Sequence, residues 1–163
     1  MIVIQEKRGN IYSNPLSHKA IDYLLIEWFE INKRILHKVT IDGKELTLKF
    51  LNTSPAFAEG DILYEDERSV IIVSILECDC IIIQAKDKIE LAGICYEIGN
   101  RHLPLFYSND ELLVAFEWPL FRWLEVSGFN VARGDRKLMQ ALKSTVSAEV
   151  HLSAELDITK NNS

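Results

Sequence analysis

The first half of the chain alternates short apolar runs with polar turns. The clearest run is residues 44–51, where Leu46, Leu48 and Phe50 fall on one face, as in a half-buried strand. The preceding Asp42–Gly43 pair predicts a two-residue hairpin turn, because both central positions of such a turn favour positive φ. Similar runs recur at residues 2–8, 23–30, 34–41, 60–67 and 69–76. This half has no convincing helical stretch, so we predict a small β-barrel or β-sandwich that ends near residue 77.

The pattern changes after residue 77. Residues 78–85 form an apolar run of strand length. Asp87 is placed to cap a helix, and Glu90 stands three residues later, at the spacing of a capping box. An apolar stripe at helical spacing follows, made of Leu91, Ile94, Cys95 and Ile98. Gly99 comes next, and we expect the helix to end there.

The remaining elements complete a recognisable order. Residues 103–107 and 111–117 read as a hairpin, and Pro119 and Gly128 bracket a second helix. Residues 129–133 are typical of a last strand, and residues 135–150 of a short helix. The resulting order, β-α-β-β-α-β, is the ferredoxin-like arrangement.

We therefore predict an α+β chain with two domains and a tail. A small all-β domain occupies residues 1–77, and a ferredoxin-like βαββαβ domain occupies residues 78–148. A flexible C-terminal tail occupies residues 149–163, where the sequence becomes polar.

Composition narrows the class of protein. The chain has 163 residues, of which 48 % are apolar, enough for a real core. The net charge of -6 argues against nucleic-acid binding, which needs clustered Lys and Arg. No apolar run approaches the roughly 20 residues of a membrane span, and the N-terminal residues do not resemble a signal peptide. Three cysteines without a disulfide framework fit a reducing cytoplasm.

One histidine stands at a defined position, just beyond the expected helix end. Free carbonyl groups give a helix C-terminus about half a negative charge, so a cation held beside His102 would gain from that field. Imidazole is a good ligand for nickel, zinc and copper. A single histidine cannot build a useful metal site, but a second copy across a two-fold axis would supply another. The alternative is an ordinary surface or interface histidine.

The three other histidines are weaker candidates for a metal ligand. His151 is either a solvated histidine of the tail or an extra ligand that the tail brings to a metal. His37 shares a strand face with Ile35 and Val39, which favours a partly buried structural role. His18 lies in a polar stretch and reads as a surface residue.

The cysteines favour a structural reading over catalysis. Cys78 and Cys80 lie on one strand face, roughly 7 Å apart, which is too far for an easy disulfide. They could hold a soft metal, but no second pair completes a tetrahedral site, so free core thiols are favoured. Cys95 falls in the buried stripe, where a thiol is inert. Since no phosphate loop, nucleophile elbow or zinc-protease motif occurs either, we expect no enzyme.

Residues 95–106, CYEIGNRHLPLF, resemble the signature of the urease accessory protein E family of nickel metallochaperones. Residues 83–102 are similar to the family's first helix, and residues 26–50 and 60–76 to its N-terminal domain. The resemblance covers about residues 1–133. The chain is most similar to Helicobacter-type members, which also lack a long histidine tail.

The resemblance implies a cytoplasmic homodimer that binds nickel and is not an enzyme. Two copies of His102 would meet at the two-fold axis to bind nickel or zinc, and His151 would complete the site. The implied partners are a second copy of the chain, with pairing of dimers left open, the urease accessory GTPase (accessory G) and the apo-urease maturation complex. The N-terminal domain would bind peptide or a partner protein.

Two departures from the family's pattern limit the expected metal capacity. The tail has only one histidine, and residues 113–118 lack the H-x-H pair of some members. We therefore expect one strong site per dimer. The competing reading is a metal-independent dimeric adaptor that only binds proteins.

Overall fold

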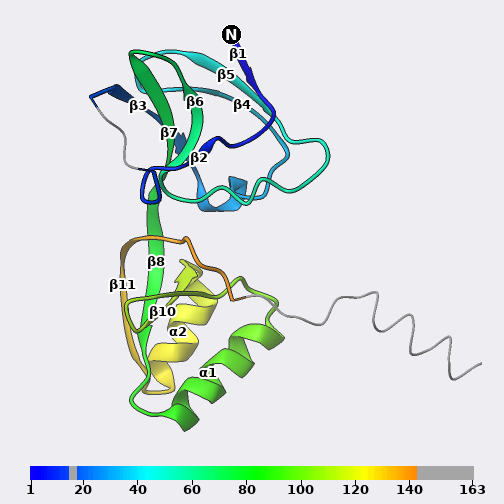
Figure 1. Cartoon of the computed structure of the whole chain (residues 1–163). Coiled ribbons are helices and arrows are strands. Elements are labelled where there is room, and N and C mark those ends of the chain that lie inside the picture. The colour runs from blue at the N-terminus through cyan, green and yellow to red at the C-terminus, as the bar shows by residue number, and fades with distance from the viewer. Residues whose placement is uncertain (15–17, 143–163) are drawn as a thin grey trace, which may run out of the picture.

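The computed structural model describes residues 1–14 and 18–142, which form an N-terminal β domain and a C-terminal α+β domain (Figure 1). Two sheets make up the first domain. The smaller has the order β1-β5-β4, with β1 at Ile2–Ile4, β4 at Ile35–Val39 and β5 at Glu45–Lys49. The larger has the order β2-β6-β7-β3, with β2 at Gly9–Asn10, β3 at Ala20–Ile26, β6 at Asp61–Glu65 and β7 at Ser69–Ile75.

One hydrophobic core joins the two sheets of this domain. Leu46 and Leu48 of β5 face Leu24 and Ile26 of β3 and Ile71 of β7 within a single buried cluster. The domain is thus a sandwich, as the alternating pattern predicts, because each sheet buries one face against the other. Phe50 belongs to the same core and packs edge-to-face against Phe57, with ring centroids 5.3 Å apart.

Two local expectations for this domain are wrong. The β4–β5 turn has three residues, since Thr40 N–H donates to Lys44 O at 2.9 Å and Gly43 alone among them has positive φ, at 84°. A glycine in the left-handed region after two turn residues is typical of a three-residue loop. The run 23–30 is also not one strand: β3 ends at Ile26, and a 3-10 turn, η1, covers Trp28–Glu30. The turn redirects the chain and carries Trp28 out of the sheet.

The second domain has the ferredoxin-like order that the sequence predicts. Its elements are β8 (Glu77–Gln84), α1 (Lys88–Asn100), β9 (Phe106–Ser108), β10 (Glu111–Ala115), α2 (Trp118–Val126) and β11 (Asn130–Lys137). The four strands form one antiparallel sheet in the order β11-β8-β10-β9. Asn109 and Asp110 both have positive φ, so the β9–β10 hairpin has a two-residue turn of type I′. The fold class, α+β with an all-β domain before a βαββαβ domain, is confirmed.

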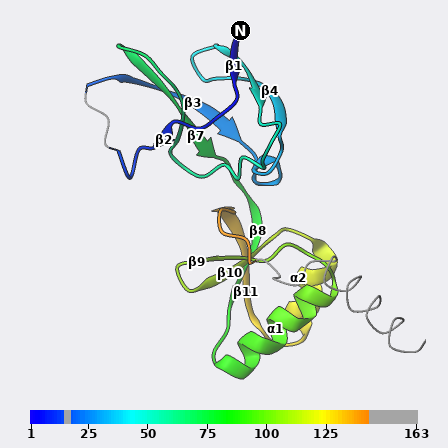
Figure 2. The same ribbon diagram turned by 45° about the vertical axis from the view of Figure 1, so that its right-hand side comes forward.

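Both helices cover the same face of this sheet (Figure 2). Ile94 and Ile98 of α1 and Leu120 and Leu124 of α2 pack on alternate residues of the strands, including Ile81 of β8. Because side chains alternate along a strand, the residues between them point to the other face. That second face carries Cys80, Ile82, Leu113 and Phe106, which form a separate cluster.

The second face is covered without a helix. After β11 the chain runs in extended form, where the sequence indicated a helix from residue 135. Leu138 is fully buried against the sheet, and Tyr107 N–H donates to Gln140 O at 3.1 Å. The segment 138–142 therefore crosses from the β11 edge to the β9 edge. Trp28 covers part of the same face, with its ring centroid 5.7 Å from that of Phe106.

Neither helix in the described parts of the chain has the length and apolar composition needed to cross a lipid bilayer.

The burial of α1 gives a first test. Ile98→Ala removes a fully buried side chain and should lower the free energy of unfolding by about 3 kcal/mol in urea denaturation. Ile89→Ala is the matched control on the same helix, because Ile89 is 86 % exposed, and it should change that free energy by less than about 0.5 kcal/mol. Equal losses for the two variants would contradict the packing described here.

Candidate metal centre

Helix α1, which ends at the candidate site, begins with the predicted cap. The Asp87 carboxylate accepts the N–H groups of Ile89 at 3.0 Å and Glu90 at 2.8 Å. Glu90 does not return to the Asp87 N–H as in a regular capping box; it accepts the N–H of Lys86 at 2.7 Å. The cap thus satisfies the first N–H groups of the helix and fixes its start.

The other end of α1 differs from the expectation. Gly99 does not end the helix, which runs on to Asn100. His102 N–H donates to Gly99 O at 2.9 Å, and Leu103 N–H donates to Ile98 O at 3.4 Å. These two bonds are those of a Schellman motif, in which the first residue after the C-cap adopts a left-handed conformation. That residue is His102 itself, with φ of 56°.

Helix α2 ends in the same motif, which makes the difference at His102 clear. Gly128 N–H donates to Glu125 O at 3.0 Å, and Phe129 N–H donates to Leu124 O at 3.1 Å. The left-handed position there is Gly128, with φ of 80°, as is usual for this motif. A residue with a Cβ in that conformation costs about 1 kcal/mol, although histidine tolerates it better than most. The chain therefore places an imidazole where a glycine would be more stable.

The imidazole lies beside an open groove of about 470 Å³. Cys95 and Gly99 of α1 form one wall, and Leu103, Pro104, Leu105 and Leu142 form the rest. A Cβ added to Gly99 would meet no atom within 4 Å, so this part of the groove is free of side chains. His102 is exposed, at the helix end where carbonyl groups concentrate negative charge. The donor type, its exposure and the local field all suit a divalent cation.

The groove also marks where the C-terminal segment starts. Leu142, the last described residue, lies in its wall and donates its N–H to Leu105 O at 2.8 Å. His151 lies outside the described residues. It follows Leu142 by nine residues, and a chain of that length spans at most about 30 Å.

The other candidate side chains are placed elsewhere. His37 shares the face of Ile35 and Val39, but that face is exposed, so the partly buried role is wrong. A ring nitrogen of His37 lies 3.0 Å from the Thr47 hydroxyl. Burial raises the pKa of Cys95, as expected for an unreactive thiol. Within residues 1–14 and 18–142 of one chain, no three His, Cys, Asp or Glu side chains gather as a metal site.

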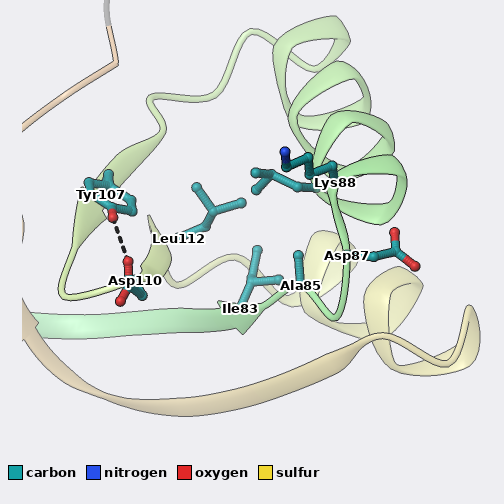
Figure 3. Close-up of a pocket in the computed structure, with 8 residues that line it drawn as sticks. Ile83, Ala85, Asp87, Lys88, Tyr107, Asp110 and Leu112 are labelled. Carbon is teal, nitrogen blue, oxygen red and sulfur yellow. Dashed lines mark hydrogen bonds between the residues drawn. The ribbon is translucent and has the colours of Figure 1, made fainter.

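A second hollow, of about 280 Å³, lies at the opposite end of α1 (Figure 3). Ile83 and Leu112 form an apolar floor, and Lys88 lies at the rim. The Tyr107 hydroxyl donates to Asp110 at 2.8 Å across one side. No histidine or cysteine lines this hollow. Lys88 at its rim precedes His102 by 14 residues, which at 1.5 Å per helical residue is about 20 Å. It is therefore not part of the candidate metal centre.

The fold and the groove define a class: a ferredoxin-like domain preceded by a β-sandwich, with an exposed histidine at the end of its first helix. Two family models match the chain. The N-terminal domain of the UreE urease accessory protein matches residues 4–76, and its C-terminal domain matches residues 78–151.

Individual relatives agree with these matches. Urease accessory protein UreE of Flavobacterium johnsoniae is 39 % identical over 150 residues, covering 92 % of this chain and 91 % of the relative. The protein of the same name from Helicobacter acinonychis is 39 % identical over 151 residues, covering 90 % and 88 %. That from Acetivibrio thermocellus is 33 % identical over 150 residues, covering 92 % and 97 %.

The chain belongs to the UreE urease accessory protein family, and the resemblance of residues 95–106 is confirmed. Membership places it among accessory proteins and implies a role in urease maturation.

The conformation of His102 leads to a stability prediction. His102→Gly should be more stable than His102→Ala by about 1 kcal/mol in urea denaturation, because glycine adopts the left-handed conformation without strain. Gly128→Ala, at the same position of α2, should lower the free energy of unfolding by a similar amount. The added Cβ would meet no atom within 4 Å, so the cost comes from the left-handed backbone alone. Equal stability of the two His102 variants would show that this backbone conformation is not imposed.

Proposed function

We propose that this chain is a nickel metallochaperone that binds its cargo between two protomers and delivers it for urease maturation. The observation that carries the proposal is the position of His102. Its imidazole is exposed beside an open groove, at the negative end of α1, in a conformation that glycine would adopt more easily. Strain kept at an exposed residue is a reason to assign that residue a function.

The proposal includes the set of ligands. Two His102 side chains related by a two-fold axis share one ion, and His151 adds a ligand from the C-terminal segment. The support is that Leu142 begins this segment in the wall of the His102 groove. Imidazole ligands suit nickel and zinc, and zinc is the second cargo of this proposal.

A homodimer follows from this ligand set. A single exposed imidazole in an open groove gives one strong ligand, so a tight site requires a second copy. Leu142 in the wall of the groove is 55 % exposed and offers an apolar contact for that copy. The dimer would pass nickel to the urease accessory GTPase (accessory G) and the apo-urease maturation complex in the cytoplasm, without catalysing a reaction.

The proposed domain boundaries follow the change of sheet. Strand β7 ends at Ile75, and β8 begins the next sheet at Glu77. We propose a partner-binding domain at residues 1–77, the metal-binding and dimerisation domain at 78–148, and a tail at 149–163. The family matches at residues 4–76 and 78–151 support the first boundary.

Nickel titration tests the first ligand. Wild-type protein should bind one nickel ion per dimer in isothermal titration, and His102→Ala should lose this site while remaining folded. His37→Ala is the control, because it removes another exposed imidazole from β4. Unchanged affinity and stoichiometry in His102→Ala would reject the site.

The second ligand has a milder expected effect. His151→Ala should weaken nickel binding by about tenfold or more, because even the loss of a residue that only supports a ligand costs about that much affinity. The dimer should persist in size-exclusion chromatography. X-ray absorption of the nickel-loaded variant should show fewer imidazole neighbours than wild type. An identical spectrum removes His151 from the site. If neither nickel nor a chelator changes the formation of the dimer and of its complex with the GTPase, the result would instead support the metal-independent adaptor.

A further inference from the structure

Two thiols lie together on the face of the C-terminal sheet that the helices do not cover. Cys78 and Cys80 are alternate residues of β8, and both are free. Their Sγ atoms are only 3.6 Å apart, although their positions along the strand differ by roughly 7 Å. The side chains thus lean toward each other, which strand spacing alone does not require.

This separation fits a bound ion better than a disulfide. With metal–sulfur bonds of about 2.3 Å, sulfurs 3.6 Å apart subtend an angle of about 100° at the metal. That angle is close to the values of three- and four-coordinate sites. A disulfide bond is about 2.05 Å long, so the sulfurs would have to approach by about 1.5 Å more on a regular strand.

The surroundings allow an ion to enter from one side. Cys78 is partly exposed, whereas Cys80 is fully buried beneath Leu138 and Phe106. On the neighbouring strand, Gly134 is paired with Cys80 and adds no side chain there. Glu27, Asp79 and Asp135 lie close enough to Cys78 to act on its charge. Arg136, the cation opposite Cys78 on β11, is held in an ion pair with Glu111 at 3.1 Å, so the carboxylates near Cys78 favour a bound cation. Cys78 is thus the entry side, and Cys80 is the anchor.

We propose that Cys78 and Cys80 form a dithiolate site for a soft cation, Cu(I), on the face of the sheet opposite the His102 groove. Thiolate ligands select Cu(I), whereas imidazole suits nickel and zinc. Binding forms two Cu–S bonds and releases two protons to solvent, with no electron transferred. A third ligand comes from solution, because the angle set by the two sulfurs is bent.

The protonation of the pair explains why the ion must be strongly thiophilic. Burial raises the pKa of Cys78 and raises that of Cys80 to about 12. Both sulfurs therefore carry protons at neutral pH, and a metal must displace them. Cu(I) binds sulfur strongly enough to do so, whereas nickel would stay with the imidazoles. Two sites on opposite faces would then sort metal ions by softness and keep copper away from the nickel ligands.

An anaerobic titration with Cu(I) against a chromophoric chelator tests the site. Wild-type protein should bind one Cu(I) per chain with X-ray absorption showing two sulfur neighbours. Cys78→Ser should lower the affinity at least tenfold, while Cys95→Ser, the matched control from α1, should leave it unchanged. His102→Ala should keep the Cu(I) site, and Cys78→Ser should keep nickel binding, so this proposal and the nickel proposal can fail separately.

Equal Cu(I) affinity of Cys78→Ser and wild type, or an equal loss in Cys95→Ser, rejects the pair as the site. If Cys78→Ser does not fold, wild-type protein treated with phenylarsine oxide decides. Its As=O group reacts with two thiols to form two As–S bonds and one water, so one adduct bridging residues 78 and 80 in peptide mapping supports the pair. An adduct elsewhere, or none, refutes it.

Discussion

The closure of helix α1 is the interaction on which the candidate site depends. Two backbone hydrogen bonds, from His102 to Gly99 and from Leu103 to Ile98, hold His102 in a left-handed conformation. Ile98 and Leu103 belong to the same core cluster, so the packing of α1 on the sheet supports the turn. A helix that ended at Gly99 would direct the imidazole elsewhere, and the groove beside it would lose its wall.

The C-terminal sheet separates two chemistries because side chains alternate along its strands. Ile81 and Ile83 of β8 face the helices and belong to the same core cluster as Leu103 and Leu105, which line the histidine groove. Cys80 and Ile82, the residues between, face Trp28 and the segment 138–142. The sheet therefore separates the imidazole from the two thiols, although Cys80 and His102 are close in the sequence. The second face also contacts the first domain, because Trp28 of η1 packs against Phe106 there.

Most of the fold could be predicted from the sequence, because its signals are local. The shared core face of Leu46, Leu48 and Phe50, the Asp87 cap and the Pro119–Gly128 bracket were each predicted from near neighbours in the sequence, and each is confirmed. The errors lie where distant contacts decide. Trp28 leaves the strand to pack against Phe106, and residues 138–142 extend because Gln140 and Leu142 pair with the β9 edge. His37 is exposed together with Ile35 and Val39, because no described residue covers that apolar face of β4.

The sequence by itself determined the βαββαβ order of the second domain, the family and the identity of His102 as the candidate ligand. These depend on residue types and spacing, which are the same in any conformation. Only the tertiary structure decided that His102 occupies the position of a glycine, that the chain returns to its groove at Leu142, and that two thiols meet at 3.6 Å. Those facts depend on which backbone groups pair and which side chains pack across the sheet, and such contacts join residues far apart in the chain.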